Sequence, residues 1–225
     1  MKIKHVSFDI WNTLLRSNPF FHEERAKYFQ QISPNNLRIN EIHTIVKDVG
    51  HYCDRIEIAD DVLFTPRQRL LMIMSKLGIE SDELLVEHFN QVDALAKFHL
   101  PIVIDESIRE KLLKLQSTGI GLSLTSNTGN LGGNIMRQLL DRVDMFKQFS
   151  FAVFSDEIGG CKPHARIFNK LISGAGVCPE EILHVGDSYD ADIAGATKFG
   201  LKSLLFTPKT PNYDDIFTNF GLDRA

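Results

Sequence analysis

The sequence predicts an α/β fold: a parallel sheet with helices on both faces, interrupted after its first strand by an inserted all-helical segment. Residues 3–8 form a short β-rich run that ends at Asp9. Apolar stripes with helical spacing and no obvious strand follow between residues 17 and 98. From about residue 101, β-rich runs alternate with helical patterns, which is typical of a parallel sheet covered on both faces.

These patterns divide the chain into two expected domains. Residues 1–16 and 99–225 are expected to form the α/β core, and residues 17–98 the helical insertion. A chain of 225 residues with 43% apolar residues is long enough to bury a core of this size.

Local signals start and stop the helices of the insertion. Asn18-Pro19 forms an N-cap and first-turn pair, and Thr65-Pro66-Arg67-Gln68 resembles a capping box with proline at the first position. Gly78 stops that helix, and Ser81-Asp82-Glu83 is expected to start a fourth one.

The second part of the chain carries the alternating elements of the core. Further helices are expected at about residues 105–118, 131–141 and 164–173, with a last one that ends at Phe199 before Gly200. The expected strands cover residues 121–125, 150–154, 182–185 and 203–206.

Polar residues follow three of the predicted strands. Asp9, Ser126 and Asp187 each stand at a strand end, where open parallel sheets bind their ligands, so they can converge although they are far apart in sequence. Two carboxylates there suit Mg²⁺, which prefers oxygen ligands. Lys162 could neutralise an anionic substrate, Ser126 with nearby backbone N–H groups could hold a phosphoryl oxygen, and a carboxylate can act as nucleophile.

The overall composition argues against several classes of protein. The formal net charge is −4 and no basic patch is visible, so no nucleic-acid partner is expected. No long apolar segment indicates a secretory signal or a membrane span. Three scattered cysteines form no disulfide framework, which fits a reducing compartment and predicts a cytoplasmic protein. The sequence leaves open whether the protein is a monomer or a homodimer.

Four short motifs occur in order along nearly the whole chain. They are Phe8-Asp9-Ile10-Trp11-Asn12-Thr13-Leu14, Leu124-Thr125-Ser126-Asn127, Gly160-Cys161-Lys162-Pro163, and Gly186-Asp187 followed by Asp192. Together they resemble the motifs of the haloacid dehalogenase superfamily, D-x-D-x-T, Ser/Thr-Asn, Lys-Pro and G-D-x-x-x-x-D. The helical insertion is similar to the cap that this family carries after its first strand.

The resemblance implies a Rossmann-like core and a Mg²⁺-dependent hydrolase acting on a small phosphorylated molecule. It also implies that Asp9 is the nucleophile and a metal ligand, and that the backbone carbonyl of Trp11 and the carboxylate of Asp187 are the other metal ligands. Ser126 would bind the transferred phosphoryl group, and Asn127 and Trp11 would contact the substrate. Lys162 would be the charge-balancing catalytic cation, and Asp192 a partner that orients these groups.

Position 11 departs from the family pattern. Phosphatases of the family usually carry a second aspartate there, which protonates the leaving oxygen, and general acid–base catalysis typically contributes about 10²–10⁴-fold. The indole of Trp11 can neither protonate the leaving oxygen nor deprotonate the attacking water. Its ring could pack beneath the cap, or it could form a wall of the substrate site.

Three functions are therefore compatible with the sequence. A phosphohydrolase working through an aspartyl-phosphate is favoured, because Gly186-Asp187 and Asp192 are retained. A 2-haloacid dehalogenase using Asp9 on carbon is the second, since such family members carry an aromatic residue at position 11. A binding or regulatory module that keeps the fold is the third.

Three residues near the start of the insertion, Arg16, His22 and Arg25, could reach the site. Arg25 could bind a carboxylate or a phosphate through two hydrogen bonds, but a solvated helix face is the favoured interpretation for each of the three. His184 lies within a predicted buried strand and is expected to be a core histidine.

Overall fold

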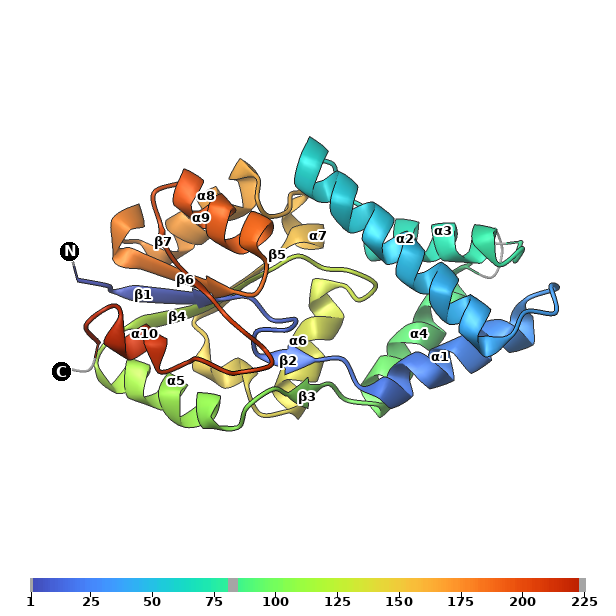
Figure 1. Ribbon diagram of the computed structural model, residues 1–225, viewed down its shortest axis with the longest axis horizontal. Coiled ribbons are helices and arrows are strands. Elements are labelled where there is room, and N and C mark those ends of the chain that lie inside the picture. Colours follow the sequence, from blue (N-terminus) through green and yellow to red (C-terminus); the bar gives the residue numbers. More distant parts are fainter. Residues whose placement is uncertain (1, 81–84, 223–225) are drawn as a thin grey trace.

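The computed structural model describes residues 2–80 and 85–222 and confirms the α/β class (Figure 1). Five parallel strands form the main sheet in the order β5-β4-β1-β6-β7. They are β1 (His5–Phe8), β4 (Gly121–Ser126), β5 (Phe151–Phe154), β6 (Ile182–Gly186) and β7 (Lys202–Leu205).

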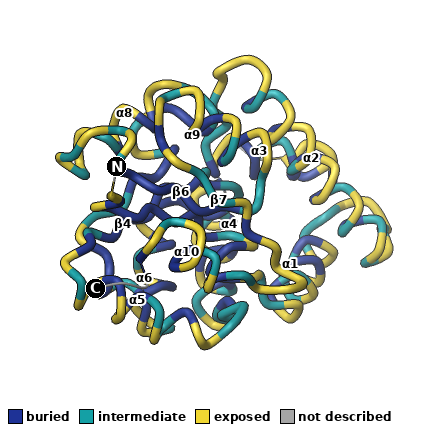
Figure 2. The backbone as a smooth tube through the Cα atoms, turned by 60° about the vertical axis from the view of Figure 1, so that its left-hand side comes forward, coloured by how far each residue is buried: buried dark blue, intermediate teal, exposed yellow. Residues whose placement is uncertain are grey.

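Helices cover the two faces of this sheet. Figure 1 shows α8 (Ala165–Ala175) and α9 (Gly195–Lys198) on one face, and α5 (Ser107–Ser117) and α10 (Asp215–Thr218) on the other. Every residue of β1 and β6 is buried, and Figure 2 shows the strands as the buried centre of the molecule. The polar residues of β1 are buried with the rest of the strand: His5 contacts the Ser123 hydroxyl at 2.8 Å, and the Ser7 hydroxyl donates to Thr125 Oγ1 at 2.9 Å.

The register of the sheet aligns the carboxyl ends of its central strands. Phe8 at the end of β1 pairs with Leu124 of β4 and with Val185 of β6. The residues that follow these positions therefore emerge at one edge, as the positions of Asp9 and Asp187 had predicted.

In the described part of the segment between β2 and β3, the chain forms four helices, as predicted. They are α1 (Pro19–Ile32), α2 (Ile39–Asp60), α3 (Pro66–Lys76) and α4 (Leu85–Phe98). The side chain of Asn18 accepts a hydrogen bond from the Phe20 N–H at 3.0 Å, and Thr65 and Gln68 form the expected capping box. The fourth helix start predicted at residues 81–83 lies outside the described residues.

A small antiparallel pair, which the sequence did not predict, connects this four-helix segment to the core. It pairs β2 (Leu15–Arg16) with β3 (Ile102–Val103), so the chain leaves and re-enters the core through adjacent strands (Figure 1). Two residues per strand are too few to produce a periodic pattern in the sequence.

The remaining short elements connect the sheet to its helices. They are α6 (Gly133–Arg142), α7 (Ser155–Ile158), the 3₁₀ turns Phe146–Gln148 and Pro179–Glu181, and a π-helical turn at Tyr189–Ala194 that opens the predicted last helix. None of the helices in the described residues is long and apolar enough to cross a membrane.

Candidate active site

A tight loop carries the chain away from Asp9 at the end of β1. The carbonyl of Ile10 accepts hydrogen bonds from the backbone N–H groups of Thr13, Leu14 and Leu15. Asn12 adopts a left-handed conformation with φ of 57°, which asparagine tolerates better than most residues. The loop holds Asp9 at its base and places Trp11 beside the cavity described below.

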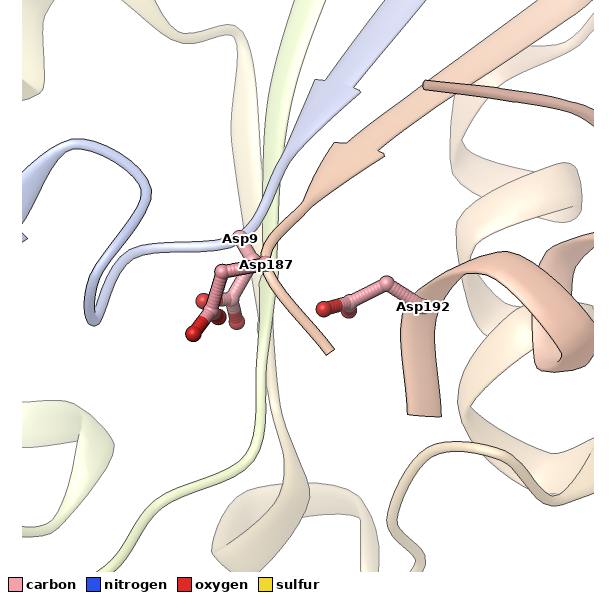
Figure 3. Close-up of side chains that lie close together, drawn as sticks. All are labelled: Asp9, Asp187 and Asp192. Carbon is pink, nitrogen blue, oxygen red and sulfur yellow. The ribbon is translucent and has the colours of Figure 1, made fainter. Parts of the chain in front are cut away.

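Three carboxylates meet at the edge of the sheet. Asp9, Asp187 and Asp192 each offer an oxygen, and these oxygens lie within 4.8 Å of one another. Figure 3 shows the carboxylates of Asp9 and Asp187 next to each other, with that of Asp192 pointing toward them from the turn after β6.

The Lys162 side chain contacts two of these three carboxylates. Its ammonium donates to Asp9 Oδ1 at 2.6 Å, to Asp192 Oδ1 at 2.6 Å and to the Thr125 carbonyl at 2.9 Å. The Lys162 side chain is only 2% exposed, so these charge-assisted bonds act with little screening by water.

The charges of the cluster do not balance among themselves. When all four groups are ionised, three carboxylates and one ammonium give the cluster a net charge of −2. Burial raises the pKa of Asp9 to about 6, against the lowering effect of Lys162, and burial with the charge of Asp192 also raises the pKa of Asp187. A set of oxygen donors with two excess negative charges fits Mg²⁺.

Asp192 is held in place by contacts that leave little room for other ligands. Burial alone would raise its pKa, but Lys162 and His184 outweigh burial and hold the pKa of Asp192 below its usual range. His184 Nε2 lies 3.0 Å from Asp192 Oδ1, and the Ser188 N–H donates to Oδ2 at 2.9 Å. His184 is fully buried, so it is a core histidine, as predicted, but one that also contacts the site.

Gly186 is required by this arrangement. A Cβ atom on Gly186 would lie 2.2 Å from the Asp192 carboxyl carbon, which is far inside van der Waals contact. The glycine of the Gly-Asp pair therefore leaves room for the carboxylate that anchors Lys162.

Asn127 holds the backbone of Lys162 through both of its polar groups. Its side-chain oxygen accepts from the Lys162 N–H at 2.7 Å, and its side-chain nitrogen donates to the Lys162 carbonyl at 3.0 Å. Asn127 also lines the cavity, so the substrate contact predicted for it stays a prediction. Ser126 is buried at the end of β4, and its hydroxyl makes a long contact of 3.4 Å with the Asn127 carbonyl.

The carboxylate cluster opens into a cavity of about 340 Å³ between the sheet edge and the four-helix segment. From the core it is lined by Asp9, Trp11, Lys162 and Asp187. From helices α2 and α3 it is lined by residues that include Asp54, Glu57 and Arg69.

Residues 3–200 match the model of a protein family described as haloacid dehalogenase-like hydrolases. The chain belongs to this family. Its membership confirms the resemblance seen in the four motifs and makes the protein an enzyme of the hydrolase class.

Several known proteins are similar to this haloacid dehalogenase-like hydrolase. Glyceraldehyde 3-phosphate phosphatase of Methanothermobacter thermautotrophicus is 35% identical over 212 residues, which cover 90% of this chain and 85% of the relative. Haloacid dehalogenase-like hydrolase domain-containing protein 3 of Xenopus laevis is 35% identical over 103 residues, which span 46% of this chain and 41% of that protein. The magnesium-bound HAD-hydrolase YfnB of Bacillus subtilis, whose structure reveals interdomain movement, covers 98% of this chain and is itself covered completely, with a TM-score of 0.73 at 19% identity.

In this hydrolase, two helices of the four-helix segment contribute an ionic cluster that the sequence did not reveal. Arg69 Nη2 lies 2.8 Å from Glu57 Oε2, and both side chains are buried. Arg69 Nη1 donates to Asp54 Oδ1, also at 2.8 Å. The one available signal was a charged residue at helical spacing within an apolar stripe, since Glu57 follows Cys53 by four positions.

A second cavity, of about 190 Å³, adjoins the first one. Both are lined by Trp11, Gly129 and Asn130. The second cavity is also lined by His22 and Arg25 from α1. The solvated helix face predicted for Arg25 is wrong, because this residue is only 5% exposed.

Proposed function

We propose that this haloacid dehalogenase-like hydrolase is a Mg²⁺-dependent phosphohydrolase that acts on a small phosphorylated molecule. The observation that carries the proposal is the cluster of Asp9, Asp187 and Asp192, in which the Lys162 ammonium pairs with Asp9 and Asp192 and two negative charges remain in excess. The 35% identity to a glyceraldehyde 3-phosphate phosphatase over 90% of this chain supports a phosphorylated substrate.

In the proposed reaction, the free carboxylate oxygen of Asp9 attacks phosphorus. The new O–P bond forms as the bond to the leaving oxygen breaks, which yields an aspartyl-phosphate and an alcohol. Water then attacks phosphorus, releases inorganic phosphate and restores the Asp9 carboxylate. Lys162 favours the ionised form of Asp9, because an opposite charge at 2.6 Å stabilises the carboxylate.

Asp9 and Asp187, with the Trp11 carbonyl, are the proposed ligands of Mg²⁺. Bound Mg²⁺ would neutralise the excess charge of the cluster and draw the anionic phosphoryl group to the nucleophile. Asp192 is proposed to position Lys162, because both oxygens of Asp192 already accept hydrogen bonds from protein groups. Ser126 is proposed to bind the phosphoryl group as it is transferred.

Residues 17–98 are proposed to form a cap over the core of residues 1–16 and 99–225. The contacts of α2 and α3 with the Asp9 cavity support this division, since they place Asp54 and Arg69 opposite the carboxylate cluster. A cap that closes over the cavity excludes water and completes the binding surface.

Asp54 of this cap is the proposed proton donor that replaces the aspartate missing at position 11. One Asp54 oxygen contacts Arg69, and its side chain is 58% exposed, so the other oxygen is available to a substrate. Glu57 is less suited, because its two oxygens are occupied by the Phe64 N–H and by Arg69.

The deciding experiment is phosphate release from a panel of phosphomonoesters and acyl phosphates, with Mg²⁺ and with EDTA. We expect release that depends on Mg²⁺ and that Asp9→Ala abolishes. Asp190→Ala, which removes an exposed carboxylate from the π-helical turn after β6, is the matched control and is expected to keep full activity. Halide release from 2-haloacids is measured in parallel, and metal-independent halide release with no phosphate release would replace this proposal with a dehalogenase.

A further inference from the structure

The second cavity contains a buried cation with no use in the reaction described above. Arg25 of α1 lies there with Phe21 and His22 of the same helix. Trp11 lines both this cavity and the one that contains the carboxylate cluster. A molecule with its reacting end at Asp9 could therefore extend past Trp11 toward Arg25.

Among the described residues, Arg25 has no carboxylate partner. Its Nε atom is buried without a hydrogen-bond partner, and its Nη2 atom only approaches His22 Nδ1 at 3.3 Å. The guanidinium carbon lies 4.8 Å from the centre of the Phe21 ring, which offers a weak cation–π contact. A buried guanidinium without a counter-charge is destabilising, so an anion bound beside Arg25 would stabilise it.

The charge and size of the cavity indicate which anion fits. Burial and the neighbouring Arg25 lower the pKa of His22 to about 4, so His22 is neutral near pH 7 and Arg25 is left with one positive charge. A carboxylate carries one negative charge and accepts two parallel hydrogen bonds from a guanidinium. A cavity of about 190 Å³ is slightly larger than one that holds benzene, at about 150 Å³.

We propose that this cavity is a carboxylate subsite, built by Arg25 with His22 and walled by Trp11. The substrate is then a short-chain organic acid that carries a phosphoryl group, with its carboxylate on Arg25 and its phosphoryl group facing Asp9. The phosphoryl half of this assignment rests on the proposed function, whereas the carboxylate subsite does not depend on it.

Trp11 can serve as a fluorescent probe of ligand binding in this subsite. It is the only tryptophan of the chain and lines the cavity, so its fluorescence reports occupancy without any turnover. The protein is titrated at constant ionic strength with hydroxyacids of two to four carbons, with the matching diols and with inorganic phosphate. We expect saturable changes with the hydroxyacids and none with the diols.

The variant Arg25→Met tests the role of the guanidinium. Loss of a charge-assisted pair is expected to weaken hydroxyacid binding about ten- to a hundredfold. Arg67→Met removes an exposed arginine from α3 and is the matched control, with wild-type binding expected. Because Arg25→Met removes an unpaired buried charge and keeps a similar volume, we expect its melting temperature to be no lower than that of the wild type.

Other results would overturn the subsite. Hydroxyacids that leave Trp11 fluorescence of the wild type unchanged, or that bind Arg25→Met equally well, would exclude it. A response to inorganic phosphate alone that Arg25→Met removes would make the site a phosphate site instead. If Arg25→Met melts well below the wild type, the variant Arg25→Lys is used in its place. A stable Arg25→Lys protein with wild-type affinity for hydroxyacids would contradict recognition by a planar guanidinium. A stable Arg25→Lys protein with weakened affinity would support it.

Turnover links the subsite to the proposed reaction. Phosphoglycolate and 2-hydroxyethyl phosphate differ at the end that would face Arg25, and we expect kcat/KM to favour the acid by about tenfold or more. This ratio is expected to approach one in Arg25→Met and to stay unchanged in Arg67→Met. If no compound of the phosphate panel is hydrolysed, the proposed function fails, and the fluorescence titration still decides the subsite.

Discussion

Trp11 occupies the position where phosphatases of this family usually place their acid, and it lines both cavities. Replacing it by aspartate supplies a carboxylate on the same loop. We expect Trp11→Asp to raise kcat/KM for alkyl phosphomonoesters, up to the roughly 10²–10⁴-fold that general acid catalysis contributes. The measurement is a comparison of phosphate release by the wild type, Trp11→Asp and Trp11→Phe. An equal gain in Trp11→Phe would attribute the effect to space rather than to proton transfer.

Residues at the strand ends were the most predictable part of the site. Asp9 and Asp187 directly follow β1 and β6, and they come together because neighbouring parallel strands end at one edge of the sheet. Lys162 and Asp192 reach the cluster from the segments that follow β5 and β6. Arg25 was not predictable in this way. It follows Phe21 and precedes Phe29 by four positions each, and periodicity cannot tell whether a basic residue on such a stripe reaches water or a buried cavity.

Among the elements, the long helices and the five main strands were predictable, whereas the link β2–β3 and the short helix α7 were not. Long periodic segments such as α2, with 22 residues, leave a clear pattern. The ionic cluster between α2 and α3 depends on how two helices pack, which no single-helix pattern contains. The structure therefore adds to the site mainly those residues that come from the four-helix segment.

Helix α2 carries the proposed proton donor, Asp54. Because aryl leaving groups need little protonation, we expect Asp54→Asn to lower kcat/KM about a hundredfold for alkyl phosphates and little for p-nitrophenyl phosphate. Asp48→Asn, an exposed substitution on the same helix, is the control and is expected to leave both rates unchanged. An equal loss on both substrates would instead indicate that Asp54 only positions Arg69.

Helix α4 contains a buried acid that should make stability depend on pH. Asp93 has a carboxylate oxygen with no hydrogen-bond partner in the described part of the chain, and burial raises the pKa of Asp93 to about 6. The folded state thus holds this proton more tightly than the unfolded state, whose pKa is about 3.9. The resulting stabilisation is complete below about pH 4 and is lost as the pH rises through about 6.

Asp93→Asn tests this assignment through the free energy of unfolding. Between pH 4.5 and pH 8, the wild type is expected to lose about 1–3 kcal/mol relative to the variant, as a shift of about two pKa units implies. Urea unfolding at both pH values measures the difference, and Asp141→Asn on the surface of α6 is the control. Equal pH dependence in the wild type and in Asp93→Asn would contradict the burial argument.

At the scale of the whole molecule, the site exists only because the fold brings distant parts of the chain together. Lys162 and Asp9 are 153 positions apart, yet their charged atoms lie 2.6 Å apart. Helices α2 and α3, which line one side of the cavity, belong to a segment whose two covalent connections to the core are β2 and β3. An unfolded chain therefore has no comparable site, and any ligand of the cluster binds the folded state selectively.

Selective binding predicts that Mg²⁺ raises the melting temperature. At a concentration about a hundredfold above Kd, binding to the folded state alone adds about 2.7 kcal/mol of stability. For a chain of this length that corresponds to a shift of roughly 5–10 °C. Asp187→Asn should remove most of this shift, while Asp190→Asn, an exposed substitution three positions further along the chain, should keep it. Without metal, Asp187→Asn should melt no lower than the wild type, because it removes one of three crowded negative charges. Thermal melts of the three proteins in Mg²⁺ and in EDTA at equal ionic strength test this, and an equal shift in all three would place the bound metal away from Asp187.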